Sequence, residues 1–279
     1  TQDPAIQKIV DEEVNNPDNY TAKRYSAEYR LSITHGDGTT EHYSERDMQS
    51  WHKNVLGDSH DGLYDSEEEV QADVDSYKAW LLKEDDTIIG ESLTKILQPQ
   101  VSFVLMDQKT GYVKAISGGR GAKTANLTLN RATNTPRQPG STFKVISAFA
   151  PALDTCGATL GTVYYDSVYS VGNKTFNNWY GQKYTGYSSI RDGIIYSMNI
   201  VAVRCLMETV SPQLGLEYAE NFGITTLTSQ DLGASQALGG LTHGTTNLEL
   251  TAAYASIANE GIYTRPVFFT KILDHDGKI

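Results

Sequence analysis

A serine and a lysine three positions apart form the most reactive combination in this 279-residue sequence. They are Ser141 and Lys144, in the stretch RQPGSTFK at positions 137–144. Side chains at i and i+3 share one face of a helix, so we predict that the Lys144 amine can take the proton of the Ser141 hydroxyl. Pro139 and Gly140 mark a helix start, where unpaired backbone amides favour negative charge. The pattern fits a nucleophile that attacks a carbonyl, although the same four letters also occur on ordinary helix surfaces.

A second polar pair, Ser197 and Asn199, stands just before the apolar run IVAV at 200–203. Such a run predicts a buried helix, and we expect the serine and the amide to face the same cleft as Ser141. The order Ser-x-x-Lys, Ser-x-Asn, Lys-Thr-Gly is the pattern of penicillin-binding proteins and serine β-lactamases. The first two of these motifs are present in that order.

Three longer runs, 131–144, 178–199 and 238–263, resemble the transpeptidase domain of a class A (bifunctional) penicillin-binding protein. The opening TQDPAIQ at 1–7 is similar to that family's junction between its glycosyltransferase and transpeptidase domains. The resemblance covers nearly the whole chain and is most specific over 101–279. It implies an α+β fold in which helices flank an antiparallel sheet, with the nucleophile at a helix start.

The resemblance also implies an activity, peptidoglycan D,D-transpeptidation without a cofactor. Ser141 would attack the carbonyl between two D-alanines of a stem peptide, with Lys144 as its base and the Ser141 backbone amide as half of the oxyanion hole. Ser197 would relay a proton to the leaving amine, and Asn199 would hold the substrate amide. Stem peptides would be the substrates and β-lactams covalent inhibitors.

Two further residues join the predicted substrate-binding set. Trp179 borders the substrate groove in the family, or it is an aromatic that anchors a loop. Gly240, beside Gly239, is expected to allow close backbone packing near the cleft. His243 is interpreted as a polar loop residue rather than a catalytic base.

The third motif departs from the family pattern, because no Lys-Thr-Gly or Lys-Ser-Gly occurs between Asn199 and Ile279. We expect it to follow Ile279, so the site in this chain is predicted to be incomplete. The run Lys109-Thr110-Gly111 has the right letters but precedes the nucleophile. It stands between two strand-like runs, 101–106 and 112–117, and therefore predicts a hairpin turn with a positive φ at Gly111.

Two other classes of function stay open at this stage. A β-lactam hydrolase would need a carboxylate to activate water on the acyl-enzyme, and the sequence leaves Glu208 and Glu249 as candidates. A penicillin-recognising sensor or an inactive fragment would bind without turnover. Rapid β-lactam hydrolysis favours the first alternative, and failure of covalent attachment favours the second.

Composition narrows the remaining possibilities. A formal charge of -11, with 23 basic residues scattered among 34 acidic ones, argues against nucleic acid. Neither a membrane span nor a signal peptide is predicted, while the resemblance implies an extracytoplasmic domain whose membrane helix precedes this chain. Cys156 and Cys205 are expected to be buried free thiols. The histidines form no metal-binding spacing, so no metal site is predicted.

The chain is predicted to divide near Gln98-Pro99 into a linker with a small α+β subdomain (1–98) and an incomplete transpeptidase domain (99–279). Alternating apolar residues from Tyr25 to Ile33 predict a strand that turns back at 35–38. Acidic residues at 65–69 begin a predicted helix that continues to Leu81. This subdomain is either a docking surface for another cell-wall protein or a spacer that positions the catalytic domain.

Several elements of the second part are predicted from periodicity and glycine stops. The nucleophile helix runs to about Asp154, and the Tyr-, Gly- and Asn-rich stretch 155–190 is expected to form loops over the cleft. Helices follow near 189–196, 199–210, 212–222 and 247–260, the last two ended by glycine. Residues 267–273 are predicted to form a strand that returns to the sheet.

Overall fold

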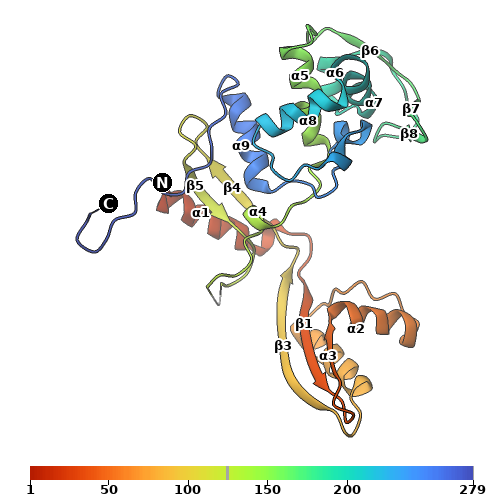
Figure 1. Cartoon of the computed structure of the whole chain (residues 1–279), viewed down its shortest axis with the longest axis vertical. Helices are drawn as coiled ribbons and strands as arrows, with labels where there is room; N and C mark the ends of the chain where they lie inside the picture. Colours follow the sequence, from red (N-terminus) through yellow and green to blue (C-terminus); the bar gives the residue numbers. More distant parts are fainter. Residues whose placement is uncertain (124–125, 279) are drawn as a thin grey trace. The chain divides into compact units, whose positions relative to one another are not determined.

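The computed structural model describes residues 1–123 and 126–278 of the chain (Figure 1). It contains two compact units. The larger consists of Thr1–Val10, Ser102–Gly118 and Leu129–Ile279, and the smaller of Asp11–Val101 and Gly119–Thr128. The first ten residues therefore group with the larger unit, whereas the predicted division kept them in 1–98. Among the described helices, none has the length and apolar character that crossing a bilayer requires.

The smaller unit is built on a three-stranded antiparallel sheet in the order β2-β1-β3. The strands are β1 (Arg24–Thr34), β2 (Thr40–Ser44) and β3 (Thr87–Gln98). Tyr29, Leu31 and Ile33 are buried, which places the apolar half of the predicted alternation on one face of the sheet. The strand and its turn are confirmed, since the chain reverses after His35 and β2 pairs with β1.

Two helices cover this buried face, α2 (Glu45–Trp51), continued by a π-helical turn at His52–Leu56, and α3 (Glu67–Leu81). Ser66 caps α3 by accepting a hydrogen bond from the Glu69 amide, and glutamates fill the first turn, where the helix dipole favours negative charge. Val70, Val74 and Tyr77 of α3 pack into one apolar cluster with the buried residues of β1. The predicted helix is confirmed.

The segment of the larger unit that begins at Ser102 opens with a hairpin. Its strands are β4 (Phe103–Met106) and β5 (Val113–Ser117). The Asp107 carboxylate accepts hydrogen bonds from the amides of Lys109 and Thr110, and Gly111 has a φ of 73°. A Cβ on Gly111 would stand 2.3 Å from the Arg265 carbonyl oxygen, so only glycine fits. Lys109-Thr110-Gly111 is therefore a turn, as predicted, and not a catalytic strand.

Helices make up most of the rest of the larger unit (Figure 1). The predicted helices are confirmed, and several are extended by 3₁₀ or π-helical turns. Helix α1 (Pro4–Asn15) begins in this unit. The others are α4 (Arg131–Asn134), α5 (Ala150–Asp154), α6 (Ile190–Ile195), α7 (Asn199–Arg204), α8 (Pro212–Asn221) and α9 (Asn247–Ala258).

The segment that carries the nucleophile lies between two apolar clusters of this unit. Phe143 and Ile146 belong to one cluster, with residues of α8 and α9. Phe149 belongs to the other, which contains the fully buried run 200–203 of α7. A π-helical turn at Val145–Phe149 joins the first turn to α5. Because side chains on both sides of this segment are buried, the position of Ser141 and Lys144 is fixed by packing.

Three sequence predictions about this unit are wrong. The stretch 155–190 contains four short strands that form two antiparallel pairs: β6 (Val163–Asp166) with β9 (Gly186–Ser189), and β7 (Tyr169–Val171) with β8 (Lys174–Phe176). Within 267–273, Val267 alone makes a bridge, to Tyr112, because it bonds to the ends of the β4–β5 turn. Cys205 is buried as expected, but Cys156 is only half-buried.

Candidate active site

Ser141 stands in a single 3₁₀ turn, Gly140–Thr142, directly after Pro139. Gly140 has a φ of 57°, and its backbone lies against Gly239, where an added Cβ would come within 2.3 Å of the Gly140 carbonyl oxygen. The predicted close approach is therefore confirmed at Gly239. The Ser141 side chain is exposed, and together with Ser197 and Trp179 it lines a cavity of about 790 Å³.

Lys144 is almost completely buried, with 2 % of its surface exposed. Its ammonium donates to the Ser197 carbonyl oxygen at 2.6 Å, to Ser197 Oγ at 3.0 Å and to Asn199 Oδ1 at 2.7 Å. Burial lowers its pKa from 10.5 to about 8, because the neutral acceptors around it do not offset the loss of water. A minority of the molecules then carry the free amine at pH 7, as a general base requires.

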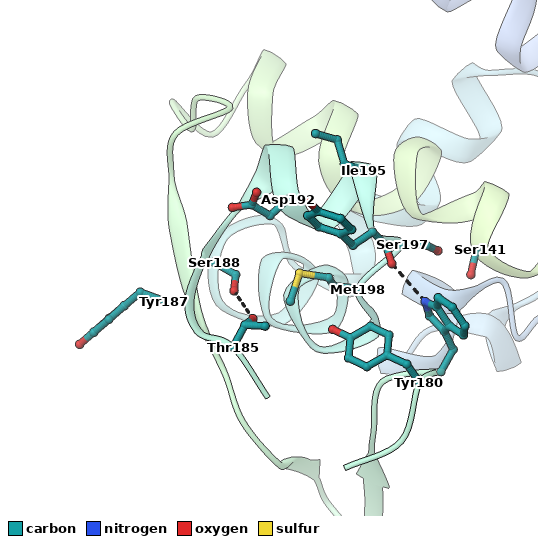
Figure 2. A pocket seen from close by; sticks show the side chains of 11 residues that line it. Ser141, Tyr180, Thr185, Tyr187, Ser188, Asp192, Ile195, Ser197 and Met198 are labelled. Carbon is teal, nitrogen blue, oxygen red and sulfur yellow. Dashed lines mark hydrogen bonds between the residues drawn. The ribbon is translucent and has the colours of Figure 1, made fainter. Parts of the chain in front are cut away.

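The structure brings the first two motifs together through Lys144. The hydrogen bonds described for its ammonium go to Ser197 and Asn199, which are 53 and 55 positions away. The direct pairing of Lys144 with Ser141 stays a prediction. Ser197 lines the same cavity as Ser141 (Figure 2). A proton path from Ser141 through the Ser197 hydroxyl to Lys144 agrees with this arrangement.

Ser197 has a left-handed backbone conformation, with a φ of 51°. A non-glycine residue in this region carries strain of about 1 kcal/mol or more, and such residues gather at functional sites. The turn lies between α6 and the start of α7, where the Met198 amide bonds to the Gly193 carbonyl. The strained turn directs both the carbonyl and the hydroxyl of Ser197 at the Lys144 ammonium.

A buried network that the sequence analysis missed fixes the start of α7. Asn178 Oδ1 accepts hydrogen bonds from the amides of Asn199 (3.0 Å) and Ile200 (3.3 Å), and its Nδ2 donates to Asp166 at 2.8 Å. Asp166 also accepts from the amide and hydroxyl of Thr185, so both its oxygens are used. The Asn177-Asn178 pair was a visible signal in the sequence, but nothing marked Asp166.

Asn199 uses both ends of its side-chain amide within the protein. Its Oδ1 accepts from Lys144, while its Nδ2 donates to the Asn177 carbonyl oxygen at 2.9 Å. The bond described for Nδ2 uses one of the two N–H donors of this primary amide. The predicted contact of Asn199 with a substrate amide would use the other donor.

The two remaining predicted binding residues differ in position. Trp179 is 70 % exposed, lines the cavity and is held by a 3.1 Å hydrogen bond from its Nε1 to the Tyr196 carbonyl oxygen. Gly240 does not line this cavity; its amide bonds to the Ser235 carbonyl in the turn that supports Gly239. His243 is an exposed loop residue.

Neither glutamate that was considered for a hydrolase lines the cavity. Glu208 pairs with Arg204 at 2.5 Å, and Glu249 accepts hydrogen bonds from threonines around the start of α9. Hydrogen bonds from Thr225 and Thr246 outweigh the effect of burial and hold the pKa of Glu249 below its usual value. Both carboxylates therefore have structural partners away from Ser141.

A family model described as the penicillin-binding protein transpeptidase domain matches residues 101–278. The chain belongs to this family. The matched residues include Ser141 and Lys144, together with Ser197 and Asn199, which accept hydrogen bonds from the Lys144 ammonium. The predicted α+β fold and the predicted class A family are thereby confirmed.

Relatives and solved structures agree with this assignment. Penicillin-binding protein 1A of Clostridium tetani is 34% identical over 212 residues, which is 70% of this chain and 26% of that protein. Penicillin-binding protein 1F of Bacillus subtilis is 37% identical over 177 residues, covering 63% and 24%. The chain thus spans about a quarter of the length of these relatives.

Two solved structures resemble the transpeptidase chain. The penicillin-binding protein PonA1 from Mycobacterium tuberculosis is 25% identical with a TM-score of 0.55, covering 65% of this chain and 49% of that one. Penicillin-binding protein 1A from Haemophilus influenzae has a TM-score of 0.57, covering 100% and 38%. At 22% identity, the second likeness supports the fold alone.

Proposed function

We propose that the chain carries the D,D-transpeptidase site of a peptidoglycan synthase, with Ser141 as the acylated residue. The observation that carries the proposal is the buried Lys144 amine, held between Ser197 and Asn199 beside the cavity that Ser141 lines. Membership of the penicillin-binding protein transpeptidase family supports the same conclusion. The substrates would be stem peptides that end in two D-alanines, and β-lactams would acylate the same serine.

We infer that acylation at this site proceeds by attack of Ser141 on the peptide carbonyl and loss of D-alanine. Ser141 Oγ bonds to the carbonyl carbon between the two D-alanines, while its proton moves through the Ser197 hydroxyl to neutral Lys144. The carbon–nitrogen bond then breaks, the proton passes to the leaving amine, and D-alanine departs. The backbone amide of Ser141 would supply one donor to the oxyanion. An amine of a second stem peptide next attacks the ester, which forms the cross-link and returns the proton to Ser141.

The setting of this site follows from the same assignment. We infer an extracytoplasmic position, because peptidoglycan is assembled outside the cell membrane and the relatives named penicillin-binding protein 1A share this domain. The described residues of the smaller unit form no cluster that suggests a second reaction, so we propose that this unit spaces the transpeptidase domain or docks other cell-wall proteins.

The direct test is the intact mass of the chain after incubation with benzylpenicillin. We expect one adduct per molecule that persists for hours, and none on Ser141→Ala. Ser170→Ala is a matched control, since Ser170 is an exposed serine outside the cavity and should leave labelling unchanged. Labelling of Ser141→Ala would refute the assignment, and rapid loss of the adduct with hydrolysed antibiotic would favour a hydrolase.

A further inference from the structure

Asp166 on β6 is a buried carboxylate that takes no part in the acylation path described above. It is 1 % exposed and is not one of the residues that line the cavity. Its described hydrogen bonds reach neither Ser141 nor Lys144. Burying a carboxylate is unfavourable unless donors surround it. The donors around Asp166 come from Asn178 and Thr185, so it joins two segments that build the site.

The first of these contacts fixes the orientation of the Asn178 side chain. Asn178 Oδ1 faces the amides of Asn199 and Ile200, which can only donate. Asn178 Nδ2 faces Asp166 at 2.8 Å, and a carboxylate can only accept. A flipped amide would place donor against donor at α7 and acceptor against acceptor at Asp166. The pairing therefore permits one orientation of the amide.

Asn178 supplies a cap that the sequence of α7 lacks. The residue before this helix is Met198, whose side chain makes no capping hydrogen bond. The amides of Asn199 and Ile200 bond instead to Asn178, which stands 21 and 22 positions earlier in the chain. The position of the first turn of α7 thus depends on the position of the Asn178 amide.

The sequence neighbours of this amide hold the same turn. The Asn177 carbonyl accepts a hydrogen bond from Asn199 Nδ2 at 2.9 Å, and Trp179 Nε1 donates to the Tyr196 carbonyl at 3.1 Å. Residues 177–179 therefore form a clamp on the turn that precedes α7.

The clamped turn carries the oxygens that surround the Lys144 amine, namely the carbonyl and hydroxyl of Ser197 and the amide oxygen of Asn199. Misplacing a reacting group by about 1 Å can cost about 100-fold in rate, even when the cause lies far from the chemistry. A residue that sets the position of the clamp therefore acts on the base.

The second contact of Asp166 fastens the wall of the cavity. Asp166 accepts hydrogen bonds from the amide (2.9 Å) and the hydroxyl (3.1 Å) of Thr185. Thr185 lines the cavity and bonds to Ser188 of β9 at 2.7 Å (Figure 2). One buried carboxylate thus ties the clamp to the strand that forms the wall.

We propose that Asp166 is a positioning residue for acylation, which acts through Asn178 to hold Ser197 and Asn199 against the Lys144 amine. This inference rests on the proposed function and adds a residue to it. Asp166 touches neither the substrate nor the reacting atoms. Its removal should therefore slow acylation in molecules that are fully folded, which a role in stability alone would not do.

Exchanging the two side chains tests the pairing. Asp166→Asn leaves one acceptor where Asn178 and Thr185 both need one, and Asn178→Asp places two carboxylates about 3 Å apart. In the double variant, the carboxylate at position 178 accepts from the amides of α7 and from the new amide at position 166. The oxygen of that new amide accepts from Thr185, so every hydrogen bond has a partner again.

The measured quantity is the rate constant for acylation of Ser141 by benzylpenicillin, followed by intact mass from pH 6 to 10. Circular dichroism identifies a temperature at which each protein is folded. We expect the high-pH plateau to fall about 30-fold in each single variant and to return to within about five-fold of wild type in the double variant. Plateaus are compared because a carboxylate at position 178 stands one hydrogen bond nearer to Lys144 and raises the midpoint.

Tyr164→Phe is the matched control, because Tyr164 lies two positions earlier on the same strand. Its buried hydroxyl bonds to Thr209 at 2.6 Å. Removing this hydroxyl costs a buried hydrogen bond but leaves the 177–179 clamp in place, so the plateau should stay within about two-fold of wild type.

Four results would overturn the positioning role and leave the proposed function standing. They are a folded Asp166→Asn variant with the wild-type plateau, a double variant no faster than the slower single variant, a double variant that does not fold, and a 30-fold loss in Tyr164→Phe. If a single variant does not fold, a double variant that folds and acylates still supports the pairing. Failure of benzylpenicillin to label the wild type would overturn the proposed function, and the positioning role with it.

Discussion

Two buried basic side chains, Lys144 in the larger unit and His52 in the smaller unit, have pKa values that are shifted in opposite directions. Lys144 in the larger unit meets a hydroxyl, a carbonyl and an amide oxygen, and burial lowers its pKa to about 8. His52 in the smaller unit is 7 % exposed and lies between Asp58 and Asp73, each 2.9 Å from a ring nitrogen. Burial alone would lower the pKa of His52, but hydrogen bonds and charges of the two carboxylates outweigh it and raise the pKa.

The comparison teaches that partner charge, more than burial, separates a structural cation from a chemical base. Two carboxylates raise the pKa of His52 and favour its protonated form, which links the π-helical turn to α3. Neutral acceptors hold Lys144 just as firmly in place but leave its proton easy to remove. The bonds described for Lys144 include no carboxylate, so no negative partner raises the pKa of its ammonium.

The largest effect is expected when the surroundings of Lys144 are made to resemble those of His52. Asn199→Asp places a carboxylate 2.7 Å from the ammonium, where Oδ1 now stands. An opposite charge at this range should move the midpoint of the pH–rate profile up by about two pH units, so benzylpenicillin acylation at pH 7 should fall about 100-fold. Stopped-flow or quenched mass measurements of acylation between pH 6 and 10 check this.

Asn199→Ala serves as the control for this substitution. It removes the hydrogen bonds of the Asn199 amide to Lys144 and Asn177 and adds no charge, so its rate is compared at every pH with that of Asn199→Asp. We expect the alanine variant to lose rate without an upward move of the midpoint. An unchanged midpoint in Asn199→Asp would contradict the idea that neutral partners keep the Lys144 amine available.

A smaller effect is expected when His52 is removed. His52→Leu leaves Asp73, which is 16 % exposed at its side chain, without its cation and should destabilise the smaller unit by about 2 kcal/mol at pH 6. Urea unfolding followed by tryptophan fluorescence measures this, since Trp51 and Trp80 lie in this unit and the Trp51 ring is 5.0 Å from His52. His42→Leu, at an exposed histidine, should change stability by less than about 0.5 kcal/mol.

The pH dependence of that loss has a definite sign. The pKa of folded His52 is raised above 6.5, so its stabilisation is complete below pH 6.5 and disappears as the pH rises through the folded pKa. The difference between wild type and His52→Leu should therefore shrink from pH 6 towards pH 9. A difference that grows with pH would mean that His52 is buried in its neutral form.

Local sequence patterns predicted the elements whose conformation depends mainly on residues close together in the chain. The alternation from Tyr25 to Ile33 became β1, and the acidic start at 65–69 became the first turn of α3. Gly111 explains why the Lys-Thr-Gly letters at 109–111 form a turn, since its positive φ is a property of the residue itself.

Long-range contacts could not be predicted in this way. Spacing suggested that Lys144 bonds to Ser141, but the contacts described join it to residues more than 50 positions away, which only the packing of α7 brings near. Asp166 became a central acceptor because β6 pairs with β9, and short strands rich in Tyr and Gly carry little local signal. The strand predicted at 267–273 had the right composition, but only Val267 among those described residues pairs with a neighbour.

The central claim is that Lys144 is a base whose pKa is near 8, and the pH dependence of Ser141 acylation by benzylpenicillin tests it most directly. If the neutral amine is required, the rate constant should rise with pH to a midpoint of about 8 and increase about 50-fold between pH 6 and pH 8. A rate that is constant from pH 6 to 9, or that rises only near 10.5, would contradict the account.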